Sequence, residues 1–321
     1  MALRSSQLSL LVFVCAHGVA AAQYPQRPIR FIVPSAAGGA ADINARFLAV
    51  ELGRQMVQQI VVDNRPGAAG SIGMELIVRA VPDGYTIGYG TSAALAINRS
   101  VLAKLPYDAD KDLQMVAQLG FQPNLLAVAP SLPVNSVKEL IAHAKTSPGK
   151  LSYGSSGSGT PPHLCMELFK IMTGTQVVHV PYKAAQQAIA EMIAGQVHLL
   201  FDNLGSIFPH VKSNRVRGLG VTSLRRSPAL PDLPTIDEAG VPGFEVTAWG
   251  GIVVPVGVPK AMVAKLNAEI NKAVASPTMK EKFSAMGIEL VGGTPEQFHA
   301  FVRKEAAKWA DVVKRSGVKL D

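Results

Sequence analysis

The segment 150–165 (KLSYGSSGSGTPPHLC) constrains the fold more than any other, because it joins a strand to a helix almost entirely through glycine and serine. Its first residues predict the end of a buried strand, and Pro162–Met172 predict a helix. Between them, Gly154–Gly159 allow the backbone to turn sharply and to approach a ligand closely. Thr160 is a typical N-cap residue, and Pro161 suits the first helical position. The chain is therefore expected to place a helix N-terminus directly at the end of a strand.

Such a junction is a typical anion site, because unpaired backbone N–H groups and the positive end of the helix dipole converge there. We expect a carboxylate to be bound by Ser155, Ser156, Gly157, Ser158 and Thr160. The alternative is a tight connection that binds nothing. Two sharper motifs are absent, since Thr160 stands where a P-loop requires Lys and Ser158 stands where a nucleophile elbow requires Gly.

A second junction of the same kind lies near the start of the chain. Ile29–Val33 is a short apolar run typical of a strand in a parallel sheet, and a helical pattern begins at Asp42. Two such turns that face each other would hold one anion from both sides. We therefore expect the first turn to contribute Ser35, Ala36, Ala37, Gly38 and Gly39 to the ligand site.

Three further polar residues follow expected strands at their carboxyl ends, where ligands of open α/β sheets collect. Ser92 and Asn98 come after the strand Thr86–Tyr89, and Asp202 comes after the strand Val197–Phe201. We expect all three to contact the ligand. The alternatives are that Asn98 only caps a turn and that Asp202 only caps the turn that follows it.

The order of expected elements indicates an α/β protein made of two lobes, each a sheet flanked by helices. Strands and helices alternate in 23–123, alternate again in 124–246, and then return to the first lobe in 247–321. The chain would cross between lobes near Gln122–Asn124 and near Phe244–Trp249. Two amphipathic helices are expected to close the chain, the last of them capped by Thr294–Gln297.

Residues 1–22 have the pattern of a cleaved signal peptide. Arg4 supplies the positive start, Leu8–Cys15 the apolar segment and Ala20–Ala22 the small residues before cleavage. The apolar segment is too short to span a bilayer. We expect an exported, periplasmic protein whose mature chain keeps only Cys165, so that no intramolecular disulfide forms. We expect this thiol to be a buried apolar group; a catalytic thiol is the alternative.

The formal net charge of +8 favours anionic small molecules through long-range attraction. Its densest positions, Lys212–Arg217 and Arg225–Arg226, include no aromatic residue and form no continuous stripe. Nucleic acid is therefore not expected as a partner.

Several of these motifs, in this order, resemble the Bug-type tripartite tricarboxylate transporter receptors. The resemblance covers nearly the whole mature chain through YPQRPIRFIVPSAAGGAAD, VDNRPGAAGSIG, PDGYT, YGSSGSGTPPHL, VPYK and FDN followed by GLGVTS. It implies a type II periplasmic binding protein whose lobes close on a small carboxylate and deliver it to a membrane permease. It also implies that the two turns hold the carboxyl group, often with waters, and that His163 and Asp202 line the same cleft.

The resemblance is incomplete after Tyr182–Lys183, where the family commonly has Gly and then Pro-Ala. Here Ala184, Gln187 and Ala188 occupy that segment, which bears on ligand identity more than on fold. We expect a monomer without cofactor, metal or catalysis. A ligand-sensing partner of a membrane sensor kinase is one alternative, and a hydrolase that uses Ser156, His163 and Glu167 is another.

The signal peptide gives a first prediction. Mass spectrometry of the periplasmic fraction of an expressing cell should find a mature chain that starts near Gln23, because the small residues before it suit signal peptidase. A chain that retains Met1 and stays in the cytoplasm would contradict this prediction.

Overall fold

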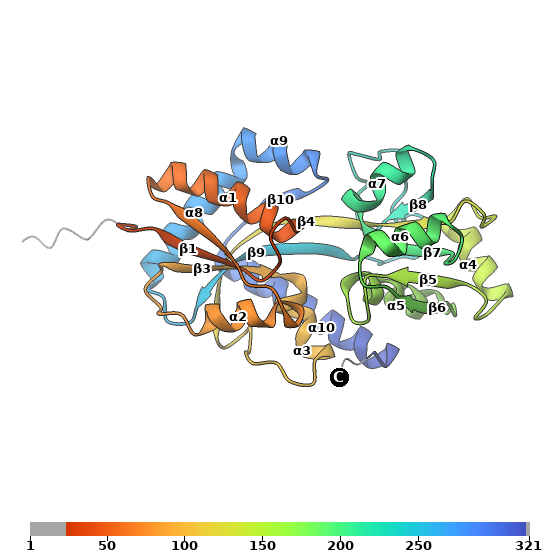
Figure 1. The fold of residues 1–321 in the computed structure, drawn as a ribbon, viewed down its shortest axis with the longest axis horizontal. Helices are drawn as coiled ribbons and strands as arrows, with labels where there is room; N and C mark the ends of the chain where they lie inside the picture. Colours follow the sequence, from red (N-terminus) through yellow and green to blue (C-terminus); the bar gives the residue numbers. More distant parts are fainter. Residues whose placement is uncertain (1–23, 319–321) are drawn as a thin grey trace, which may run out of the picture.

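The computed structural model describes residues 24–318, so the expected signal peptide 1–22 and its cleavage site lie outside the described residues. The fold is mixed α/β, with helices covering the strands of two neighbouring groups (Figure 1). No helix within 24–318 is long and apolar enough to cross a membrane.

The first group is built on three parallel strands in the order β2-β1-β3. Its central strand is almost wholly buried, as its continuous apolar sequence requires. The elements in chain order are β1 (Ile29–Val33), α1 (Ala40–Met56), β2 (Ile60–Asn64), η1 (Ala68–Gly70), α2 (Ser71–Val78), β3 (Thr86–Thr91), η2 (Ala93–Ile97) and α3 (Asn98–Val101).

The second group contains the parallel strands β5, β6 and β7, with β5 in the middle. Its elements in chain order are α4 (Val137–Thr146), β5 (Ser152–Ser155), α5 (Pro161–Thr173), β6 (Val178–Pro181), α6 (Ala185–Ile193), β7 (Leu199–Asn203), α7 (Leu204–Lys212) and β8 (Arg217–Val221). The chain then returns to the first group through β9 (Thr247–Pro255), α8 (Lys260–Ala275), α9 (Pro277–Ala285), β10 (Glu289–Gly292) and α10 (Pro295–Ser316).

One long strand, β4 (Leu113–Val128), belongs to both groups. Residues 113–123 pair with β9, whereas residues 124–128 pair with β7 and β8. β4 and β9 therefore run together between the two halves in Figure 1. We propose that the lobes divide where β4 changes partners, which gives lobe I as 23–123 with 247–321 and lobe II as 124–246.

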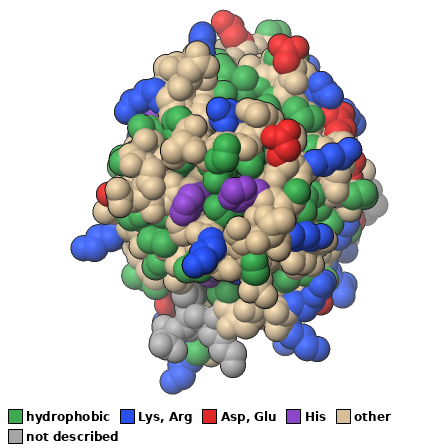
Figure 2. Space-filling view, turned by 90° about the vertical axis from the view of Figure 1, so that its right-hand side faces the viewer, with side chains coloured by type: hydrophobic (Ala, Val, Ile, Leu, Met, Phe, Trp, Pro, Cys, Tyr) green, Lys and Arg blue, Asp and Glu red, His purple; other side chains and the backbone are tan. Residues whose placement is uncertain are grey.

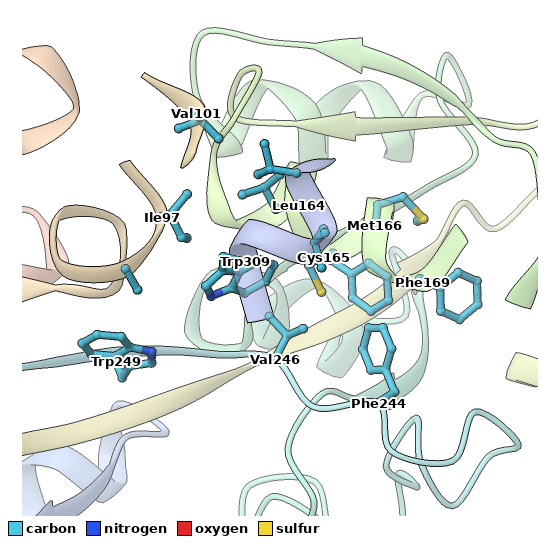
Figure 3. Packing of buried hydrophobic residues seen from close by; sticks show 14 of the residues in the cluster. Ile97, Val101, Leu164, Cys165, Met166, Phe169, Phe244, Val246, Trp249 and Trp309 are labelled. Atoms are coloured by element: carbon cyan, nitrogen blue, oxygen red, sulfur yellow. The ribbon is translucent and has the colours of Figure 1, made fainter. Parts of the chain in front are cut away.

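The largest apolar core is shared by the two proposed lobes rather than confined to one. Figure 3 shows Ile97 and Val101 of lobe I near Leu164 of α5, with Trp309 of α10 beside them. α10 thus packs on α5 of lobe II although it belongs to lobe I in the proposed division. Cys165 lies in this core with no exposed surface, and burial raises the pKa of its thiol, which confirms the expected buried apolar role.

A buried carboxylate fixes α10 to the strands that join the lobes. Glu305 accepts hydrogen bonds from the indole N–H of Trp249 at 3.0 Å and of Trp309 at 3.3 Å. Lys308 forms an ion pair with Glu305 and also donates to the backbone carbonyl of Glu245. The carboxylate is therefore paired with a cation and hydrogen-bonded, as a buried charge requires.

Most expected elements are present, and the local signals explain why. α2 has the predicted bounds, Pro161 stands in the first turn of α5, and α10 begins with the predicted capping box at Thr294. The expected side-chain cap at Thr160 is wrong, because its hydroxyl donates to the Gly157 carbonyl instead. The prediction for the end of the chain was also incomplete, since the separate helix α9 and the strand β10 were not expected.

Candidate functional site

The first turn, 35–39, is held by an acid in the first turn of α1. Asp42 is buried and accepts the Gly38 N–H at 2.8 Å and the Asn64 amide at 2.9 Å, and it pairs with Arg46. Burial opposes its charge, yet these hydrogen bonds hold the pKa of Asp42 below its usual value. One of the expected ligand donors, the Gly38 N–H, is thus used inside the protein.

Other groups of this turn have no internal partner. Within residues 24–318, no hydrogen bond uses the N–H groups of Ala36 or Ala37, and the buried Ser35 hydroxyl has no partner either. Gly39 is the N-cap of α1 and provides no side chain to cap it. The turn therefore offers neutral donors beside a helix N-terminus, which is the chemistry that a carboxylate needs.

The second turn, 155–160, is more extensively bonded to itself. The hydroxyls of Ser155 and Thr160 both donate to the Gly157 carbonyl, at 3.0 and 2.7 Å, and the Gly157 N–H donates back to Ser155. No hydrogen bond within the described chain uses the hydroxyls of Ser156 or Ser158. Of the predicted hydroxyl donors, only these two therefore remain for a ligand.

Two stacked histidine rings lie beside this turn. The ring of His163 accepts the Gly159 N–H through Nδ1 at 2.8 Å, and the ring of His179 meets the Ser155 hydroxyl at 2.6 Å. The two ring centroids are 3.9 Å apart and the planes differ by 8°. His163 is buried and contacts the turn from inside the lobe. It was predicted to line the ligand cleft, and in the structure its connection to that cleft is through the turn that it holds.

A cavity of about 190 Å³ lies where α1, the end of β3 and the joining strands meet. Both proposed lobes contribute to it, and none of the residues that line it is charged. The lining residues that carry a hydrogen-bonding side chain or an indole are Asn44, Tyr89, Thr91, Ser92, Gln122, Asn203 and Trp249. A second cavity of about 440 Å³ shares Asn44, Gln122 and Asn203 with it, so the two are neighbours at the base of the space between the lobes.

One buried hydrogen-bond acceptor at this base has no partner within the described chain. Asn44 donates to the Tyr89 hydroxyl at 3.3 Å, but its own side-chain oxygen is buried without a partner in the described chain. Such a group costs free energy unless something pairs with it. A ligand hydroxyl or amine, or a water, is the natural partner.

Asp202 lies at the end of β7, next to the cavity residue Asn203. Its carboxylate is 3% exposed and accepts the backbone N–H of Asn203 at 2.6 Å. Burial raises the pKa of Asp202 to about 6, and the single backbone hydrogen bond only partly opposes this shift. The local bond supports a turn-capping role, and the absence of a cationic partner within residues 24–318 leaves the carboxylate available to a ligand.

The predicted site residues do not all meet in one cavity. Ser92 lines the smaller cavity, whereas Asn98 donates to the Ala69 carbonyl at 3.0 Å and so holds the η1 loop. Neither turn lines the two cavities, although Ala40, directly after the first turn, lines both. No hydrogen bond joins the two turns within residues 24–318. Their joint action on one ligand stays a prediction.

Six of these hydrogen-bonding cavity residues were missed by the sequence analysis: Asn44, Tyr89, Thr91, Gln122, Asn203 and Trp249. Asn203 could have been found, because it adjoins Asp202 at a strand end. Gln122 and Trp249 come together only because β4 and β9 pair, with Phe121 opposite Trp249, and no local signal reveals that register.

Two α/β groups joined by shared strands, with uncharged cavities at their junction, are typical of a two-lobed solute-binding receptor. Residues 44–318 match the model of the tripartite tricarboxylate transporter family receptor. The chain is also similar to Protein BugT of Bordetella pertussis, with 35% identity over 96% of each chain. The chain therefore belongs to the Bug-type receptors of the tripartite tricarboxylate transporter family, and it is an extracytoplasmic solute-binding receptor.

Solved structures agree with this membership. Rpa4515 of R. palustris with adipate is 38% identical, has a TM-score of 0.81, and the match covers 92% of this chain and 99% of that one. MatC of Rhodopseudomonas palustris with bound malate is 29% identical, with a TM-score of 0.76 and coverage of 90% and 100%.

The geometry of the second turn gives a prediction about glycine. Gly157 has a φ of +126°, which side-chain-bearing residues rarely adopt, so Gly157→Val must rearrange the turn. We expect ligand affinity to fall by at least about thirtyfold, or about 2 kcal/mol, in calorimetry. The matched control is Gly174→Val, since Gly174 also has a positive φ (+66°) but lies at the far end of α5. The control should lose stability and keep its affinity; equal affinity losses in both variants would contradict the prediction.

Proposed function

We propose that this receptor captures a small carboxylate between the turns 35–39 and 155–160, performs no chemistry on it and presents it to a membrane permease in the periplasm. The observation that carries the proposal is the pair of strand–turn–helix junctions, each with unpaired polar groups and neither with a Lys or Arg side chain. Binding by dipoles and hydroxyls suits a ligand that must be released again, because a full ion pair in a closed cleft would resist opening.

Similar proteins support the ligand class. One similar structure has adipate and another has malate, and both molecules carry two carboxyl groups. Malate also carries a hydroxyl, for which the unpaired Asn44 oxygen and the Asp202 carboxylate are suitable acceptors. The observations favour a small organic acid over any cationic or apolar ligand.

A third cavity carries more basic than acidic side chains. It has a volume of about 510 Å³, borders the second cavity, and is lined by residues of both proposed lobes, among them Arg225, Arg226 and Lys280 and one acid, Glu289. These cations would raise the local concentration of an anionic ligand without contacting it in the bound state. Figure 2 shows Lys and Arg side chains scattered over the end face of the molecule, which supports a general attraction for anions rather than a nucleic-acid stripe.

The residues that a hydrolase would use already make structural contacts. His163 accepts the Gly159 N–H through Nδ1, and Glu167 accepts hydrogen bonds from Tyr153 and Lys170. Neither group is free to act as a general base toward Ser156, as a triad requires. This arrangement supports a receptor without catalysis, and we further propose that it acts as a monomer.

The carboxylate proposal is tested with a ligand and its ester. A thermal-shift screen of mono-, di- and hydroxycarboxylates identifies the best ligand, and calorimetry then compares it with the ester in which the turn-bound carboxyl is methylated. We expect the ester to lose at least about a hundredfold in affinity, because the charge-assisted hydrogen bonds from the turns are lost. Tight binding of the ester, or heat from turnover of the acid, would contradict the proposal.

The role of Asp202 is tested by Asp202→Asn. Since burial raises the pKa of Asp202 in the folded protein, its contribution to stability is full at acidic pH and is lost as pH rises through about 6. The amide cannot ionise, so the variant should be more stable than wild type at neutral pH by about 1–3 kcal/mol. If Asp202 accepts a ligand hydroxyl or amine, the same variant should bind such a ligand more weakly by about 2 kcal/mol or more.

Adipate, which has neither group, is the matched control ligand for Asp202→Asn. The binding of a ligand that lacks a hydroxyl and an amine should change little. If affinity for hydroxy and amino acids is unchanged while stability alone changes, Asp202 is a turn cap and not a ligand contact.

A further inference from the structure

We propose that His163 is a positioning residue for ligand binding, whose neutral ring fixes the 155–160 turn through Gly159 and whose protonation at acidic pH releases the ligand. This inference rests on the proposed function, because it assigns the ligand to that turn. It goes further by coupling ligand affinity to the charge of one buried ring.

The contact itself defines the required protonation state. The Gly159 N–H can only donate, so the Nδ1 atom that receives it at 2.8 Å must carry no proton. The ring proton is therefore on Nε2, which faces a Glu167 oxygen at 3.7 Å. A doubly protonated ring would direct an N–H at the Gly159 N–H. The contact thus exists only while His163 is neutral.

Burial makes the loss of this contact costly. The His163 side chain is 7% exposed and Gly159 is buried, so water does not readily replace the missing acceptor. A buried N–H without a partner is unfavourable, and the turn would have to rearrange to expose it. The rearrangement would reach Ser158, which carries one of the two unused hydroxyls.

The surroundings of the ring favour the neutral form. Burial lowers the pKa of His163; Glu167 opposes this shift, and Lys170 adds to it. Glu167 is already compensated by the Tyr153 hydroxyl at 2.6 Å and by Lys170 at 2.7 Å. On the other side His179 stacks on the ring, and burial followed by the charge of His163 lowers the pKa of His179 to about 4. Burial therefore keeps both rings neutral at neutral pH, and repulsion between the stacked rings opposes a charge on both at once.

The sign of the pH effect follows. Above the lowered pKa of His163 the ring is neutral and the turn is intact; as pH falls through that pKa, the ring gains a proton and Gly159 loses its acceptor. Ligand affinity should therefore be highest at neutral pH and fall by up to about tenfold per pH unit below the pKa. Asp202 also titrates in this range, so variants are needed to separate the two groups.

The experiment measures the Kd of malate and of adipate by calorimetry as a function of pH, from about 7.5 down to about 4.5. His163→Asn places an acceptor oxygen near the position of Nδ1 but cannot gain a proton. It should bind within about threefold of wild type at neutral pH and lose the steep acidic fall. His163→Leu removes the acceptor and should bind about tenfold more weakly at every pH. An acidic fall that is as steep in His163→Asn as in wild type would overturn the inference.

His198 provides a matched control in the same lobe. Its Nδ1 also accepts a backbone N–H, from Ser152 at 3.0 Å, but that contact lies at the start of β5 and not at the turn. His198→Asn should keep both the affinity and the pH profile of wild type. If His198→Asn flattens the profile as His163→Asn does, the effect is not specific to the turn and the inference fails.

A ligand-free measurement separates this inference from the proposed function. In nitrogen-15 NMR, the amide signal of Gly159 should shift with the titration of the His163 ring in wild type and stay constant in His163→Asn. If malate and adipate do not bind but this coupling is seen, the choice of ligand is wrong and the positioning role stands. A Gly159 amide that ignores the titration overturns the positioning role even where both acids bind.

Discussion

The antiparallel pairing of β4 with β9 is the interaction on which the rest of the structure depends. It runs from Leu113 opposite Pro255 to Pro123 opposite Thr247, and beyond it β4 continues into the second sheet. The same register places Gln122 and Trp249 at the base of the space between the lobes. Glu305 then ties Trp249 to α10, so the floor of the site is fixed to the largest core.

Each of the two turns uses some of its N–H groups to hold its own shape and leaves other donors for a ligand. Asp42 takes one N–H of the first turn, and His163 takes one N–H of the second. Each internal bond removes a donor from the ligand but orders the donors that remain, which lowers the entropy lost on binding. An anion can therefore be held without a cationic side chain.

The features that could be predicted from the sequence are those that depend on residues close together in the chain. Strand–turn–helix junctions, the buried Cys165 and the capping box at Thr294 depend on neighbouring residues and were predicted. The hydrogen bond from the Gly38 N–H to Asp42 is also local, since it joins residues four positions apart. It was missed because Asp42 was considered only as the start of a helix. The stack of His163 on His179 joins α5 to β6, sixteen residues apart, and only the parallel pairing of β5 and β6 brings the two rings together.

The shared core restricts how the proposed lobes can move when a ligand binds. α10 and the start of α5 pack together with Ile97 and Val101 of lobe I, so pulling them apart would expose apolar surface at about 25 cal/mol per Å² (Figure 3). Closure around a ligand is therefore easiest as a rotation that keeps this core intact and bends β4 and β9. Such a rotation changes most the side of the larger uncharged cavity that lies beside α1 and α7, because Trp249 holds the floor of the smaller cavity to the core. The Gly/Ser turn precedes α5 directly, so its position relative to lobe I is set largely by packing, and its internal hydrogen bonds, including the one to His163, decide whether it has the shape to bind.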